Sequence, residues 1–114
     1  MPDAEPWRGL NDPAARLTAG LEALYGWYER NAALAACVLR DAEHHEPTRE
    51  VTELRLGPPM AACREVLGTG LDDRQRALLG LALSFSTWRT LVRDGGLDRD
   101  EAVATMVRAI LSAG

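Results

Sequence analysis

The chain contains no lysine, and all thirteen of its basic residues are arginine. Aspartate and glutamate together number 17, which gives a formal net charge of −4 and an isoelectric point near 5.1. Proteins that bind nucleic acid through their own surface usually carry an excess of positive charge, so this composition argues against direct DNA binding. We attribute the exclusive use of arginine to genomic composition bias rather than to phosphate recognition.

Cysteine and long apolar runs are also scarce. The only two cysteines are Cys37 and Cys63, and the polar first ten residues do not resemble a secretory leader. We therefore expect two free thiols in a reduced, cytoplasmic protein. The longest apolar stretch, Ala77–Phe85, is much shorter than the roughly 18 residues typical of a membrane span, so no membrane partner is predicted.

Sequence motifs that carry chemistry are missing as well. No nucleophile and base stand in an order typical of an enzyme, so we predict no catalytic residues. Adjacent histidines on a helix point about 100° apart, so His44 and His45 are not expected to share a metal ion. Gly68-Thr69-Gly70 is too short for a phosphate loop and follows no predicted strand. We expect neither a metal nor a cofactor.

Helical periodicity is what the chain does contain, and no segment alternates with the period of a strand. Asp12-Pro13 is a typical helix start, and the stripe that follows ends or bends near Asn31. Residues 1–11 are expected to form a flexible arm that Trp7 and Leu10 attach to a single domain, residues 12–114. We predict an all-α bundle of five to six helices, with segments at 13–30, 34–44, 48–56, 60–67, 74–93 and 98–112.

The last two segments form a helical hairpin. Asp72 or Asp73 can cap a helix over Arg74–Arg93, which Asp94-Gly95-Gly96 ends. Asp98, with Glu101 three residues later, then caps the second helix.

The first of these helices has two stripes of apolar or small residues at about 100° per residue. One stripe contains Leu78, Leu81, Ala82, Phe85, Trp88 and Val92, and the other contains Leu79, Leu83, Ser86 and Thr90. A helix with two such faces needs a cover on both. We expect the protein's own core to cover one face and a second copy of the chain to cover the other, which predicts a homodimer.

Short strings in the chain resemble the C-terminal domain of TetR-family transcription regulators. They are Leu83-Ser84-Phe85-Ser86-Thr87-Trp88-Arg89-Thr90-Leu91-Val92, Gly95-Gly96-Leu97, Glu101-Ala102-Val103, the run Leu21–Asn31 and Val38-Leu39-Arg40-Asp41-Ala42. The resemblance covers about residues 12–112. Those regulators begin with a helix-turn-helix domain, for which residues 1–11 leave no room, so DNA would be reached only through a domain outside this chain.

The resemblance implies an effector-sensing and dimerisation domain in which a small apolar ligand changes the spacing of two attached DNA-binding domains. The two final helices would then form the dimer interface, listed as Leu79, Leu83, Ser86, Thr90, Val103, Met106, Val107 and Ile110. Inward-facing aromatics beside the Pro58-Pro59 helix break suggest a pocket lined by Leu21, Tyr25, Tyr28, Val38, Met60, Cys63, Leu67, Leu81, Phe85 and Trp88. The same side chains also suit a filled core, which would favour the alternative: a helical dimerisation or protein-interaction module without a ligand.

Overall fold

The computed structural model describes the backbone of residues 1–44 and 58–114 and the side chains of residues 1–33 and 58–114. The predicted helix over 48–56 and the side chains of Cys37, Val38 and His45 lie outside these ranges. Within them every regular element is helical and no strand occurs, which confirms the all-α prediction.

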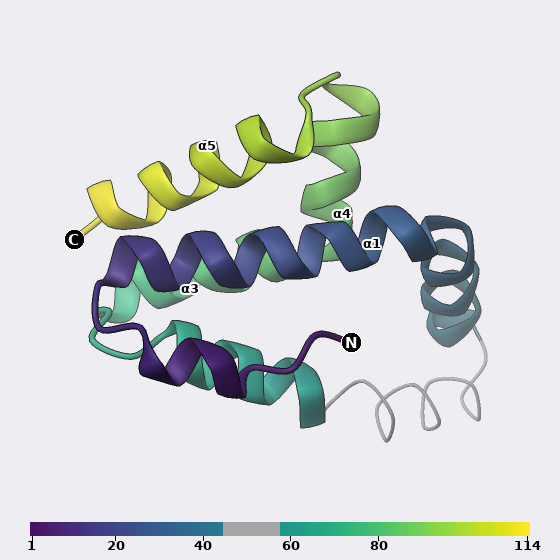
Figure 1. The fold of residues 1–114 in the computed structure, drawn as a ribbon. Coiled ribbons are helices and arrows are strands. Elements are labelled where there is room, and N and C mark those ends of the chain that lie inside the picture. Colours follow the sequence, from purple (N-terminus) through teal and green to yellow (C-terminus); the bar gives the residue numbers. More distant parts are fainter. Residues whose placement is uncertain (45–57) are drawn as a thin grey trace.

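A long helix, α1 (Pro13–His44), runs through the middle of the molecule. The C-terminal helix α5 (Arg99–Ser112) packs along it, and α3 (Asp73–Leu83) packs against both α1 and α5 (Figure 1). A four-residue helix, α4 (Phe85–Trp88), and a π-helical segment, η2 (Arg89–Asp94), connect α3 to the turn before α5. Residues 58–67 are also helical. These helices enclose one apolar core.

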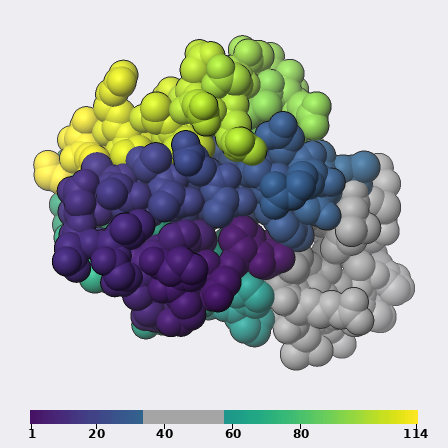
Figure 2. Space-filling model, in the orientation of Figure 1, coloured from purple at the N-terminus to yellow at the C-terminus, as the bar shows by residue number. Residues whose placement is uncertain are grey.

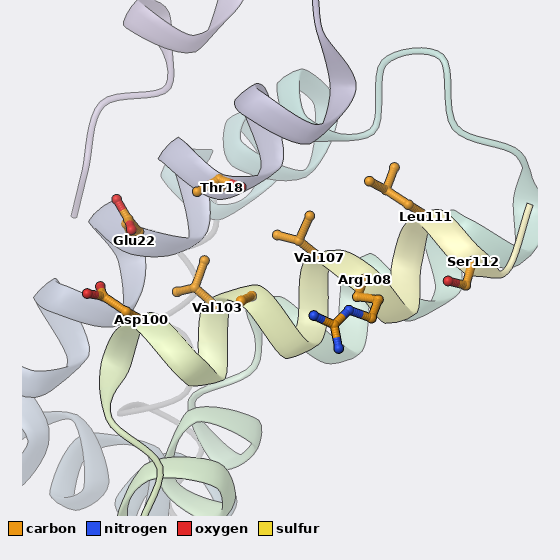
Figure 3. Close-up of a pocket in the computed structure, with 9 residues that line it drawn as sticks. Thr18, Glu22, Asp100, Val103, Val107, Arg108, Leu111 and Ser112 are labelled. Carbon is orange, nitrogen blue, oxygen red and sulfur yellow. The ribbon is translucent and has the colours of Figure 1, made fainter.

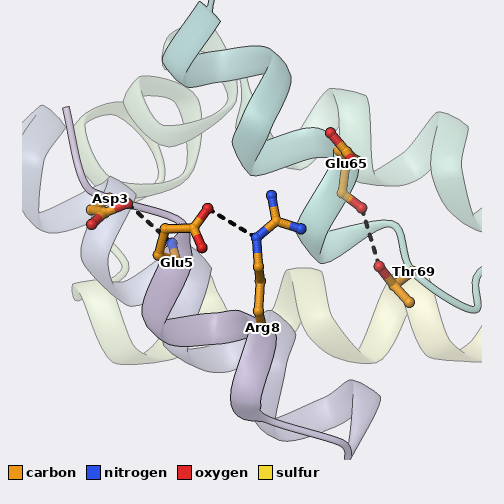
Figure 4. Close-up of polar contacts among 5 residues, drawn as sticks. All are labelled: Asp3, Glu5, Arg8, Glu65 and Thr69. Carbon is orange, nitrogen blue, oxygen red and sulfur yellow. Dashed lines mark hydrogen bonds and ion pairs between the residues drawn. The ribbon is translucent and has the colours of Figure 1, made fainter.

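The N-terminal arm is packed against the body of the molecule. Its short 3₁₀ helix η1 (Glu5–Gly9) buries Trp7, and Figure 2 shows the arm lying along one side of α1 with α5 on the opposite side. Within the arm, the Glu5 amide donates to Asp3 Oδ1 at 3.1 Å and Arg8 Nε donates to Glu5 Oε1 at 3.0 Å (Figure 4). The segment expected to be flexible thus has a helical turn and a buried anchor at the predicted tryptophan.

A buried arginine also fixes the arm to the rest of the fold. Arg16 is only 7% exposed, and its two terminal nitrogens donate to the carbonyl oxygens of Leu10 and Thr69, both at 2.7 Å. Arg16 therefore joins the end of the arm, α1 and the turn at 68–70. The apolar periodicity of the sequence gives no sign of this role, because a charged residue does not contribute to an apolar stripe.

Several predicted helix ends are confirmed. Asp12, Asp72 and Asp98 each accept a hydrogen bond from the backbone amide three residues ahead. Gln75 completes a capping box by accepting a bond from the Asp72 amide. Helix α1 bends at Asn31, whose φ of −122° and ψ of 18° are not helical, and the hairpin turn uses Gly96 at a positive φ of 75°.

The predicted continuous helix over 74–93 is wrong, because the helix breaks at Ser84. This residue is extended, with a φ of −70° and a ψ of 136°, and its hydroxyl accepts a hydrogen bond from the Ser86 amide to start α4. The break changes the direction of the chain. The buried face of α3 therefore does not continue along α4, and each helix has its own orientation toward the core.

The break also overturns the predicted assignment of the α3 faces. Leu81, expected to face inward, is 55% exposed, whereas Leu79 and Leu83, expected to face a second copy, are fully buried in the chain's own core. A stripe drawn at a constant 100° per residue assumes one straight helix. Phe85 and Trp88 do face inward as predicted, but α4 orients them separately.

Candidate functional site

The centre of the molecule is an aromatic cluster held together by two tyrosine hydrogen bonds. The hydroxyl of Tyr25 donates to the carbonyl of Ala82, and that of Tyr28 donates to the carbonyl of Leu83, both at 2.6 Å. In a continuous helix, amides four residues ahead would bond these carbonyls. The two tyrosines of α1 therefore satisfy backbone acceptors at the α3–α4 break.

Burial changes the acidity of this cluster. Desolvation raises the pKa of Tyr25 and of Tyr28 above the ordinary tyrosine value, and it also raises the pKa of the buried Cys63 thiol. All three side chains are therefore neutral at physiological pH. A phenol that already donates to the backbone and a protonated buried thiol provide neither a nucleophile nor a general base.

Most of the predicted pocket residues lie together, but as a packed core. Tyr28 packs edge to face on Phe85, with ring centroids 5.3 Å apart, and its centroid is 6.2 Å from that of Trp88. Met60 is half-buried, Leu81 is exposed and outside the cluster, and the side chain of Val38 lies outside the described residues. The buried members of the predicted set are Leu21, Tyr25, Tyr28, Cys63, Leu67, Phe85 and Trp88.

One polar atom in this core lacks a partner among the described residues. Trp88 is 0% exposed, and its indole Nε1 donates no hydrogen bond there. The guanidinium of Arg93 lies 5.1 Å from the centroid of the Trp88 ring, and Arg89 lies 5.7 Å from that of Phe85. Buried indole N–H groups usually find an acceptor, so the lack of one for Trp88 Nε1 among the described residues is unusual.

The predicted dimer-interface residues are divided between the core and the surface. Ser86 and Thr90 are exposed, as an interface would require. The α5 residues face inward instead, because α5 covers α1 and α3 with its apolar side. The buried members of the predicted set are Leu79, Leu83, Val103, Met106, Val107 and Ile110.

A shallow groove of about 460 Å³ lies between α1 and the outer flank of α5 (Figure 3). Val103 and Val107 form its apolar floor, and Leu111, which is 37% exposed, extends the floor toward the end of the helix. Glu22 and Asp100 lie together at one end, whereas Arg108 lies further along α5. Within the described residues neither Asp100 nor Arg108 forms an ion pair, so both charges are available to a partner.

Sequence reasoning missed this groove, although a signal for it was present. Asp100, Ala104 and Arg108 follow one another at intervals of four residues and therefore line one flank of a helix. Leu111 continues that flank. The periodicity of apolar residues identifies only the inner face of α5, because charged residues do not contribute to an apolar stripe.

The described residues contain no cluster of three or more potential metal ligands, and none of their helices is long and apolar enough to cross a membrane. Comparison of the chain with models of known protein families, with curated proteins and with solved structures gave no significant match.

Proposed function

We propose that this chain is a helical homodimerisation module in which two copies pair through the groove between α1 and α5. The observation that carries the proposal is the self-complementary pattern of that groove. It has an apolar floor, and the acidic Asp100 and the basic Arg108 lie at equal distances on either side of Ala104. A two-fold axis requires such a surface, because each residue then meets its counterpart on an identical patch.

The spacing of the charges specifies how the two helices pair. Ala104 lies midway between Asp100 and Arg108, about 6 Å along the helix axis from each. In an antiparallel pair centred on Ala104, Asp100 of one copy faces Arg108 of the other. The two-fold axis generates a second, identical pair, in which Arg108 of the first copy faces Asp100 of the second. The small side chain at the centre permits a close helix approach of about 8 Å.

Apolar contacts provide the stabilising part of this interface. Leu111 is 37% exposed at the end of the groove, where the other copy would cover it. Removing apolar surface from water favours association, whereas rim charges mainly set orientation and specificity. Val103 and Val107 are almost fully buried in the chain's own core, so the exposed Ala104 and Leu111 would provide the apolar surface that pairing covers.

Charge reversal tests this pairing directly. Asp100→Arg and Arg108→Asp should each weaken the dimer, because each variant places two like charges opposite one another across the axis. The double variant should restore the dimer, since it exchanges the signs and keeps each pair complementary. Sedimentation equilibrium across a range of protein concentrations measures the dissociation constant of each variant.

Asp73→Arg is the matched control, because Asp73 is also an exposed acid in the first turn of a helix but lies on α3. It should leave the dissociation constant unchanged while sharing any loss of helix-dipole stabilisation. A monomeric wild type at micromolar concentration, or a double variant that dissociates as readily as the single ones, would contradict the proposal.

Effector sensing, the function that the TetR resemblance implies, is the second candidate, and the unpartnered Nε1 of Trp88 favours it. A small apolar molecule with one acceptor atom would satisfy this donor if the aromatic cluster rearranged to admit it. A thermal-shift screen of such molecules tests this, since a ligand that binds only the folded state raises the melting temperature.

Trp88→Phe is the control, because it keeps an aromatic ring but removes the donor. It should reduce the shift produced by acceptor-bearing compounds and preserve the shift produced by any compound that binds elsewhere. If no compound stabilises the wild-type protein, the ligand-free dimerisation module remains the better description.

A further inference from the structure

A second groove, about 530 Å³ in volume, lies on α1 where the start of the arm and Arg99 of α5 border it. Its walls include Trp27 and two arginines, Arg30 and Arg99. We propose that this groove binds a small organic carboxylate with an apolar body, held by the two guanidinium groups. The site is separate from the aromatic core, and the proposal does not depend on dimerisation.

The absence of a side chain at Gly26 allows the two arginines to converge. A Cβ atom at this position would lie 3.1 Å from Nη1 of Arg99 and 3.3 Å from Nη1 of Arg30. Both nitrogens therefore border the same small volume, although they come from different helices. An anion placed at this point would therefore lie within reach of both guanidinium groups at once.

The surrounding charges favour a single negative charge on the ligand. Glu29 Oε2 lies 3.7 Å from Arg99 Nη1, which is an ion-pair distance but too long for a hydrogen bond. Glu22 lines the same groove one helical turn before Gly26. Because both glutamates lie close to the arginines, each further negative charge on a ligand is repelled by them, so a monoanion is favoured over a dianion such as phosphate.

Guanidinium geometry selects a carboxylate among the monoanions. Each guanidinium presents parallel N–H groups that match the two oxygens of a carboxylate. The rest of the groove suits an apolar body, because Ala19 and Ala23 form a flat floor and the half-buried indole of Trp27 provides an aromatic wall. An aromatic acid would thus contact the groove through both its charge and its ring.

An NMR titration with sodium benzoate tests the site in the intact chain. Benzoate should cause saturable shifts of the Gly26 amide and the Trp27 indole signals, and benzamide, which has the same shape without the charge, should not. Arg30→Gln and Arg99→Gln should each weaken benzoate binding about tenfold, the loss expected for a charge-assisted hydrogen bond. Arg74→Gln, an exposed change on α3, should leave the affinity unchanged.

Four results would overturn the proposal. Equal shifts with benzamide would mean that the groove binds apolar rings regardless of charge. Equal or tighter binding of inorganic phosphate would indicate a general anion surface. Unchanged affinity in both arginine variants would place the ligand elsewhere, and absence of shifts up to the solubility limit of benzoate would remove the site. The amide spectrum of each variant verifies that its fold is intact.

Discussion

The two ends of α3 are stabilised in different ways. At the N-terminus, Asp72 and Gln75 exchange two hydrogen bonds within one helical turn. At the C-terminus, the carbonyls of Ala82 and Leu83 accept bonds from tyrosines 57 and 55 residues earlier in the chain. One end is therefore satisfied by its neighbours in sequence, and the other by a different helix.

This difference separates local from tertiary control of the fold. A capping box can form in any context that permits a helix, because its donors and acceptors are four residues apart or less. The break at Ser84 needs acceptors to be satisfied from outside, since unpaired buried carbonyls are costly. The break, and with it the orientation of Phe85 and Trp88, thus depends on α1 being packed against α3.

The largest expected effect comes from a charge at the C-terminal end of α3. Leu83→Arg should destabilise the protein by more than about 3 kcal/mol, because it buries an uncompensated charge in the core. Leu81→Arg, two residues earlier on the exposed face, should change the free energy of unfolding by less than about 0.5 kcal/mol. Urea denaturation measures both. Similar losses in the two variants would contradict the observed face assignment.

Removing the tyrosine hydroxyls should weaken the same end more gently. Tyr25→Phe and Tyr28→Phe should each cost about 1 to 3 kcal/mol, because each leaves a buried carbonyl without its donor. The double variant measures whether the two bonds act together, since both carbonyls belong to one break. Wild-type stability in both single variants would show that the break does not depend on these hydroxyls.

The burial of Tyr25 and Tyr28 can also be tested without a mutation, by measuring stability at alkaline pH. Above the ordinary tyrosine pKa of 10, the unfolded chain loses phenolic protons that Tyr25 and Tyr28 retain in the folded state, because burial raises their pKa. The unfolded state then binds fewer protons, so stability should fall by about 1.4 kcal/mol per pH unit for each tyrosine. Denaturation measured at successive pH values should show this slope, and either phenylalanine variant should remove the share of one tyrosine.

Cys63 contributes to the same pH profile from a lower starting point. Its pKa is also raised by burial, so its share of the stability loss should begin near the ordinary thiol value of 9. Cys63→Ala separates the two contributions by removing the earlier part of the decline. A profile that stays flat from pH 9 upward in the wild-type protein would contradict burial of all three groups.

The smallest effect is expected at the N-terminal end of α3. Asp72→Ala should cost about 1 kcal/mol, the usual loss for an N-cap side chain, and the helix should keep its position. Thermal denaturation measures the change, and Asp73→Ala, next to the cap, is the matched control. A loss as large as that of Tyr25→Phe and Tyr28→Phe combined would remove the contrast between the two ends.

Helix ends were the features most accessible from the sequence. Asp12, Asp72, Asp98 and Gly96 each act through their own conformation or through residues within one turn, so their roles could be predicted. The inward orientation of Tyr25 and Tyr28 was also predicted, but not the acceptors of their hydroxyls. Those acceptors exist only because α3 ends beside α1.

The candidate sites were less accessible, because they consist of residues that no apolar pattern selects. The convergence of Arg30 and Arg99 on Gly26 depends on how α5 crosses α1. The groove beside Val107 and Leu111 depends on the same packing. A sequence pattern shows which residues share a face of one helix, but not which face of the next helix lies opposite.

By itself, the sequence determined the all-α class, the main helix starts, the bend at Asn31 and the Gly-Gly turn, because these depend on backbone preferences and hydrogen bonds over a few residues. Only the tertiary structure decided that Ser84 breaks the helix, that Leu83 rather than Leu81 is buried, and that Arg16 holds the arm. These features depend on which packing of the helices has the lowest free energy. That free energy includes contacts between residues far apart in the sequence, which replace their contacts with water.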